Sequence, residues 1–195
     1  MPEPTFLARL KESTRPLHED IERSVDMATG MKSIDGYRQL LERYLGFVEP
    51  AEDRLGQVVS PGAVPDFPAR RKSRLIRDDL VALGVDPATI AGLPRCDDFP
   101  DMTPLPRALG CLYVLEGSTL GGQYMAKHVE STLGVRRDAG SAYLRSYGDD
   151  VGPMWKRFGA ILTEHASDEP TCLAIIDSAH DMFASFGRWF TAIYA

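Results

Sequence analysis

The chain has 195 residues and a mass of 21.5 kDa, the size of one ordinary domain, so we expect residues 1–195 to form a single domain. Hydrophobic residues make up 44% of the chain and charged residues 26%, which excludes a disordered chain and a membrane-spanning one. The net charge of -6 provides no overall positive field for phosphate backbones, so we expect no nucleic-acid partner.

The cysteines and the N-terminal sequence indicate a cellular compartment. Cys96, Cys111 and Cys172 are far apart and form no C-x-x-C pair, which argues against a disulfide framework and favours a reducing compartment. The start, MPEPTFLARLKE, lacks the apolar stretch of a secretory signal, and no run of about 20 apolar residues follows. We therefore expect a cytoplasmic protein without a membrane partner.

The first half of the chain predicts three helices. The first has a buried face at three- and four-residue steps, formed by Leu7, Leu10, Thr14, Leu17 and Ile21, with Thr5 as a suitable N-cap. A second, long helix starts at Ser33 or Asp35 and includes Tyr37, Leu40, Leu41, Tyr44, Val48, Ala51 and Leu55. After a proline-rich loop, a third helix is expected from about Ala69 to Leu83. Residues 84–104 contain too many prolines and glycines for one continuous element, which predicts a linker loop.

The second half predicts three more helices. A largely apolar segment runs from Leu105 to Leu133 and contains three internal glycines. Asp149 or Asp150 can cap the next helix, and Asp168 can cap a last one that reaches Ile193. No segment alternates with the period of a strand, so we expect an all-α fold of about six main helices.

Several common catalytic motifs are missing from the sequence. It contains no phosphate-binding loop of the G-x-x-x-x-G-K-[ST] type, no G-x-G-x-x-G and no G-x-S-x-G. The segment His18-Glu-Asp-Ile-Glu22 has a glutamate where the zinc motif H-E-x-x-H requires its second histidine. For a di-iron helix bundle, only the segment from Asp177 to His180 comes near the required pair. Nucleotide, serine-hydrolase and simple zinc chemistry are therefore disfavoured.

His18 is the most informative of the four histidines. It lies at the edge of the buried face of the first helix, about 60° from its centre at 100° per residue. Glu22 follows one turn later and could fix the tautomer of a metal-bound imidazole. A histidine at such a boundary with a glutamate one turn on is more often a plain surface pair, so this helix alone leaves both interpretations open.

The glycines between Leu105 and Leu133 are the second informative feature. Gly117, Gly121 and Gly122 each cost about 1 kcal/mol relative to alanine inside a helix, which requires a compensating role. Without a Cβ, the helix backbone can approach a flat ligand closely, although close helix packing explains such glycines equally well. Together with a ligand-type histidine, these glycines describe a slot for a planar metal cofactor such as haem. Cations at its rim, Lys11 on the first helix and Lys156 with Arg157 on the fifth, could bind carboxylates of the cofactor.

Two segments resemble the heme oxygenase family. LKESTRPLHEDIE, from Leu10 to Glu22, is similar to the proximal helix of that family, and GCLYVLEGSTLGGQ, from Gly110 to Gln123, is similar to its distal helix. The motifs occur in the family's order, and the sequence of the second motif is most similar to the bacterial branch that accompanies bacteriophytochromes. The resemblance covers nearly the whole chain.

The resemblance implies a role for each matching residue. His18 corresponds to the proximal iron ligand and Glu22 to its orienting partner, while Lys11 and Thr14 match haem-contacting positions of the proximal motif. The distal glycines correspond to those over the haem, and Lys156 and Arg157 fall in a region of further propionate contacts. Animal-type members have aspartate where this chain has Ser118, so Glu116 or Gln123 is a candidate to take part in the distal network.

The activity that the resemblance implies is the cleavage of haem, as both substrate and cofactor, to biliverdin, carbon monoxide and iron. It requires dioxygen and an electron donor such as a ferredoxin, a flavodoxin or a reductase, and a bacteriophytochrome is a candidate receiver of the biliverdin. Two alternatives stay open at this point. One is a haem carrier or sensor on the same fold, and the other is a related helical protein without haem, such as a thiaminase-like or di-iron protein.

Overall fold

The structure is a computed structural model that describes residues 4–24 and 30–191. In these ranges the chain forms helices and no strand, which confirms the predicted all-α class. The helices are α1 (Phe6–Ser24), α3 (Ile34–Val58), α4 (Phe67–Arg70), α5 (Ser73–Ala82), α6 (Pro87–Ala91), α7 (Leu105–Leu133), α8 (Ala142–Arg145), the 3₁₀ turn η1 (Gly148–Asp150), α9 (Val151–His165) and α10 (Glu169–Thr191). Of the described helices, none is both long enough and apolar enough to cross a lipid bilayer.

Most of the predicted helix starts are correct because the side chains named for them satisfy free backbone N–H groups. The Ser33 hydroxyl accepts from Gly36 N at 3.1 Å, and the Asp168 carboxylate accepts from Thr171 N at 2.8 Å. Thr5 accepts from Ala8 N at 3.3 Å. Asp150 occupies the N-cap position of α9 without a side-chain cap bond. The predicted end at Ile193 lies outside the described residues.

The predicted third helix from Ala69 to Leu83 is wrong as one element. It is divided into α4 and α5, with a break at residues 71 and 72. The buried Glu52 on α3 causes the break, because its carboxylate accepts from the backbone N–H groups of Lys72 and Ser73 and so starts α5 there. The linker predicted over residues 84–104 also contains a short helix, α6, capped by the Asp86 carboxylate on Thr89 N at 3.2 Å.

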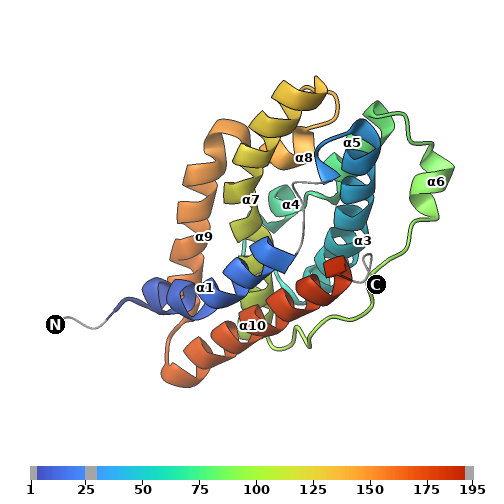
Figure 1. Cartoon of the computed structure of the whole chain (residues 1–195). Coiled ribbons are helices and arrows are strands. Elements are labelled where there is room, and N and C mark those ends of the chain that lie inside the picture. Colours follow the sequence, from blue (N-terminus) through green and yellow to red (C-terminus); the bar gives the residue numbers. More distant parts are fainter. Residues whose placement is uncertain (1–3, 25–29, 192–195) are drawn as a thin grey trace.

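α7 is the central helix of the bundle, with α3, α8, α9 and α10 packed around it (Figure 1). Its first half is buried almost without interruption from Ala108 to Val114. Gly110 allows α10 to approach closely, since a Cβ there would lie 2.1 Å from the carbonyl oxygen of Ile175. α7 is therefore held firmly at its N-terminal half, and its second half carries more exposed residues.

α1 and α10 run side by side in the same direction, as Figure 1 shows. Arg9 forms two hydrogen bonds with the Glu169 carboxylate, at 2.8 and 2.5 Å. Further along, Nε2 of His180 lies 3.1 Å from the carbonyl oxygen of Ser13. Because a carbonyl oxygen only accepts, this nitrogen carries the proton. α10 thus supports α1 at successive points along its length.

Candidate functional site

α1 crosses α7 in front of it in the view of Figure 1, and a buried contact fixes the crossing point. Thr14 is 3% exposed, and its hydroxyl lies 3.5 Å from the hydroxyl of Tyr113 on α7. The same Thr14 hydroxyl donates to the carbonyl of Leu10 at 2.8 Å. Thr14 therefore fixes the two helices against each other, and its expected contact with haem stays a prediction.

His18 follows Thr14 by one helical turn and is exposed. Its Nδ1 lies 3.5 Å from the Glu22 carboxylate, the pair that the sequence predicts. Its ring and that of Phe183 on α10 make an edge-to-face contact, with the centroids 6.2 Å apart and the planes at 79°. Among the described residues, no group contacts the other ring nitrogen, Nε2. This nitrogen is therefore available to a ligand from outside the chain.

The three glycines of α7 have different surroundings. A Cβ on Gly121 would meet no atom within 4 Å, so this position faces open space. A Cβ on Gly117 would lie 3.8 Å from the indole of Trp155, an ordinary contact. A Cβ on Gly122 would lie 2.7 Å from the carbonyl oxygen of Leu144, so the close approach of α8 explains this glycine. Gly121 is thus the glycine whose missing side chain leaves room for a flat ligand.

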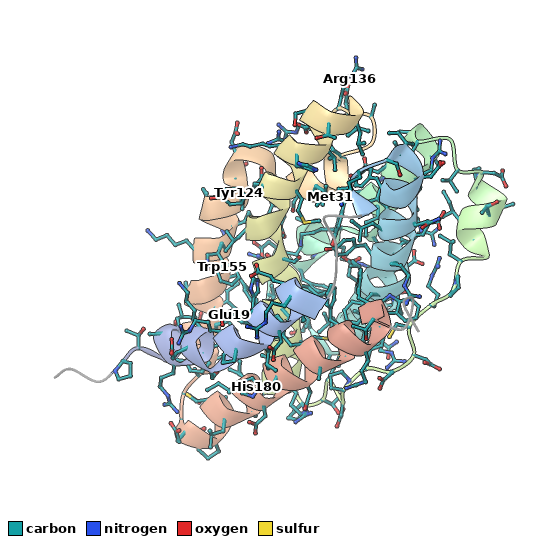
Figure 2. The ribbon with its side chains drawn as sticks, in the orientation of Figure 1. Glu19, Met31, Tyr124, Arg136, Trp155 and His180 are labelled. Atoms are coloured by element: carbon teal, nitrogen blue, oxygen red, sulfur yellow. The ribbon has the colours of Figure 1, made fainter. Side chains whose placement is uncertain are left out.

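Exposed apolar side chains flank Gly121 on α7. Leu120 is 40% exposed and Tyr124 is 78% exposed, an uncommon arrangement for large side chains on a helix. Figure 2 shows Tyr124 and Trp155 on the α7 and α9 side of the molecule, above the crossing with α1. Gly121 is therefore bordered by surface that a large, mainly apolar ligand could cover.

Ser118 and Gln123, two polar residues of the same segment, are both bonded to backbone. Ser118 is exposed, and its hydroxyl donates to the carbonyl of Leu115 at 2.7 Å. The Gln123 amide donates to the carbonyl of Arg145 at 2.8 Å, which directs it toward α8. Of these two residues, Ser118 is the more exposed on the surface of α7.

Glu116 is 1% exposed and faces the interior behind the glycines, away from any surface slot. Its carboxylate pairs with Arg70, accepts from Lys72 Nζ at 2.5 Å and accepts from the Tyr147 hydroxyl at 2.8 Å. Thr119, one turn on, is also buried. Burial therefore separates Glu116 from the exposed surface of α7 at Gly121, and its pairing with Arg70 and Lys72 holds α7 in place. The expected part of Glu116 in the distal network stays a prediction.

Burial dominates the ionisation of the groups around Glu116. It lowers the pKa of the Lys72 ammonium, and the neighbouring Glu116 carboxylate only partly offsets this effect. Burial and the Glu116 carboxylate raise the pKa of Tyr147. Burial also raises the pKa of Tyr143 well above its usual value. A buried polar cluster with shifted pKa values thus lies directly behind the exposed face of α7.

The cations expected at the rim are only partly placed there. Lys11 is exposed on α1, one turn before Thr14. Lys156 is exposed on α9 and has no ion-pair partner among the described residues. Arg157 lies 3.4 Å from Asp66, so its guanidinium is directed to the loop before α4. Lys11 and Lys156 are therefore the better candidates to contact carboxylates of a ligand.

Sequence reasoning missed Arg70, Lys72, Tyr143 and Tyr147. Arg70 and Lys72 reach Glu116 on α7 because the chain breaks between α4 and α5. The available signal was Glu116 itself, because a carboxylate in an apolar helix requires buried cations. In the described part of the chain, no group of three or more His, Cys, Asp or Glu residues could hold a bare metal ion.

Comparisons with known proteins agree on one family. A family model described as heme oxygenase matches residues 4–192. The heme oxygenase of Xanthomonas campestris pv. campestris (strain 8004) is 31% identical over 169 residues, which cover 82% of this chain and 92% of that protein.

Two solved structures share the fold. A heme oxygenase from Neisseria meningitidis, determined with NO and CO bound, matches with a TM-score of 0.77 at 21% identity, covering 98% of this chain and 93% of that one. A heme oxygenase from Leptospira interrogans matches with a TM-score of 0.74 at 16% identity, covering 97% of this chain and all of that one (100%).

Proposed function

Since the chain belongs to the heme oxygenase family, its substrate is haem, and we propose that His18 binds the haem iron from the α1 side while α7 covers the opposite face at Gly121. The observation that carries this proposal is the state of the His18 imidazole, which is exposed and whose Nε2 has no hydrogen-bond partner among residues 4–24 and 30–191. Metal-bound histidines commonly have a carboxylate on the second ring nitrogen, and Glu22 supplies one.

The residues around His18 fit a flat ligand between the two helices. The Thr14–Tyr113 contact places α1 against α7 two turns before Gly121, a rise of about 12 Å along the helix. Gly121 contributes no side chain to the space in front of it, and Leu120 and Tyr124 border that space. In the part of the chain that the structure describes, the ammonium groups of Lys11 and Lys156 form no ion pair, so both can pair with the two haem propionates.

When bound, haem supplies the iron that activates dioxygen and the ring that is cleaved. His18 would hold the haem iron through Nε2, and α7 presents backbone and no coordinating side chain at Gly121. The bulk of α7 confines the opposite face and so excludes most solvent from it. Lys11 and Lys156 would pair with the propionates of a bound haem and so would orient it between the two helices.

The products proposed are biliverdin, carbon monoxide and iron. The electrons come from an external donor, for which a ferredoxin, a flavodoxin or a reductase is suitable. A bacteriophytochrome is the proposed receiver of the biliverdin, because the sequence from Gly110 to Gln123 resembles the branch that accompanies bacteriophytochromes.

Conversion of added hemin tests the proposal. Purified protein is mixed with hemin, and the absorbance from the Soret band to the red is followed after reductant is added under air. We expect loss of the Soret band and growth of a bilin spectrum, and we expect His18→Ala to abolish this conversion. His128→Ala is the matched control, since His128 is exposed on α7.

The outcomes separate the competing functions. Undiminished bilin formation by His18→Ala would refute the role of His18. A stable haem complex that forms no bilin under reductant would instead indicate a haem carrier or sensor, the alternative that the serine at position 118 favours.

A further inference from the structure

Two small hollows lie behind the exposed face of α7. One has a volume of about 10 Å³ and the other about 20 Å³, so the larger can hold one water molecule. Three residues line both hollows: Lys72, Ser118 and Tyr143. Of these, Lys72 and Tyr143 are buried and Ser118 is exposed. The hollows therefore connect a buried ammonium group to the surface of α7 that faces the proposed haem site.

The hydrogen bonds of Lys72 leave part of its ammonium group free. Nζ donates to the carbonyl of Arg70 at 2.7 Å and to the Glu116 carboxylate at 2.5 Å. An ammonium group has three N–H donors, so one remains for the hollows. The Tyr147 ring lies 4.8 Å from Nζ on one side and supports the charge.

Tyr143 and Ser118 continue the path outward. Tyr143 and Ser118 line the same two hollows as Lys72, and a hydroxyl both donates and accepts, so each can pass a proton on. Ser118 has no ionisable side chain of its own. A proton source further inside is therefore required if this segment is to deliver protons.

We propose that Lys72 is the proton donor for the α7 side of the haem site, and that the proton leaves Nζ through a water in the hollow and the Tyr143 hydroxyl to Ser118 Oγ. The proposal rests on the haem site assigned above. Reduction of dioxygen by the external electrons consumes protons, and Lys72 supplies them where bulk solvent is excluded.

The proton that leaves Lys72 is replaced from solvent, and the charges left in the cluster remain paired. The N–H bond of Lys72 breaks, each hydroxyl and the water give up one proton as they receive one, and Nζ is left neutral. Glu116 then keeps Arg70 as its cation, so no buried carboxylate loses its only partner. Between turnovers a proton from solvent returns to Nζ by the same path through Ser118.

Three variants and a matched control test the role of Lys72. Lys72→Met removes the donor, Lys72→Arg keeps the charge on a group that does not release its proton, and Tyr143→Phe interrupts the path. Tyr147→Phe is the control, because Tyr147 binds the same Glu116 oxygen but lines neither hollow. We expect the three variants to bind haem normally, to form bilin about tenfold or more slowly and to release more peroxide. The control should keep both wild-type values.

Specific results would overturn the proposal. A wild-type rate of bilin formation in folded Lys72→Met or in Tyr143→Phe would do so. An equal loss of this rate in Tyr147→Phe would also do so, because it would show that Lys72 acts by holding Glu116. If the Lys72 variants do not fold, Tyr143→Phe decides alone. A wild-type protein that converts no haem refutes the proposed function together with this role, whereas conversion that is insensitive to Lys72 and Tyr143 refutes this role alone.

A measurement on the haem-free protein gives a readout that is independent of turnover. With lysine labelled by nitrogen-15, the Lys72 ammonium protons should show a nuclear Overhauser effect to a long-lived water, and Tyr143→Phe should weaken it. An ammonium group without any water contact would contradict the path.

Discussion

Gly121 and Gly122 are neighbours on α7, and the structure predicts opposite effects of alanine at the two positions. A Cβ at Gly121 meets nothing within 4 Å, so Gly121→Ala gains up to about 1 kcal/mol of helix stability. A Cβ at Gly122 would lie 2.7 Å from the oxygen and 3.5 Å from the carbonyl carbon of Leu144, which are backbone atoms that cannot rotate away. Overpacking of this kind costs about 1–3 kcal/mol, so Gly122→Ala should destabilise the fold despite its better helix propensity.

The assay is unfolding of the haem-free protein. We expect the melting temperature to rise by about 2–4 °C in Gly121→Ala and to fall in Gly122→Ala, with the same order of midpoints in urea. Haem titration then separates the roles: Gly121→Leu should fold normally but bind haem about tenfold more weakly, a loss of about 1.4 kcal/mol. A neutral Gly122→Ala, or a Gly121→Ala that destabilises the haem-free protein, would refute this assignment.

Three further predictions concern two buried carboxylates and the half-buried His180. Glu116→Ala should lower the free energy of unfolding by about 3–5 kcal/mol, because it leaves Arg70 and Lys72 buried without their carboxylate, and a loss below 1 kcal/mol in urea unfolding would contradict the cluster. Burial raises the pKa of Asp79 from 3.8 to about 6, so between these values the unfolded chain binds fewer protons than the folded chain. The free energy of unfolding therefore falls as pH rises through this window, by up to about 3 kcal/mol. Unfolding at pH 4 and pH 7 should show this loss in the wild type and not in Asp79→Asn. His180→Leu should cost about 1 kcal/mol by removing the donor to Ser13 O, and His180→Gln, which keeps an N–H there, should restore the wild-type midpoint.

The sequence predicted the fold well where local signals determine the structure. The apolar periodicity of α1, α3 and α10, together with the caps Ser33 and Asp168, is sufficient to place those helices. The bounds predicted for the segment from Leu105 to Leu133 are those of α7. The assignment of residues 1–195 to one domain stays a prediction.

The errors arise where a distant residue determines the local structure. The break between α4 and α5 depends on Glu52 of α3, about 20 residues away, which no local pattern shows. The same limit applies to the glycines: all three look alike in the sequence, but only the position of α8 distinguishes Gly122 from Gly121. The burial of Glu116 could not be read from the sequence either, because it depends on the register of α7 against α4.

A crystal structure of the protein with haem bound is the most direct test of the arrangement proposed here. We predict a bond from Nε2 of His18 to the iron, the Glu22 carboxylate on Nδ1, and the Gly121 backbone across the other face of the ring. An iron bound by a different residue, or a haem that lies away from Gly121, would contradict the account.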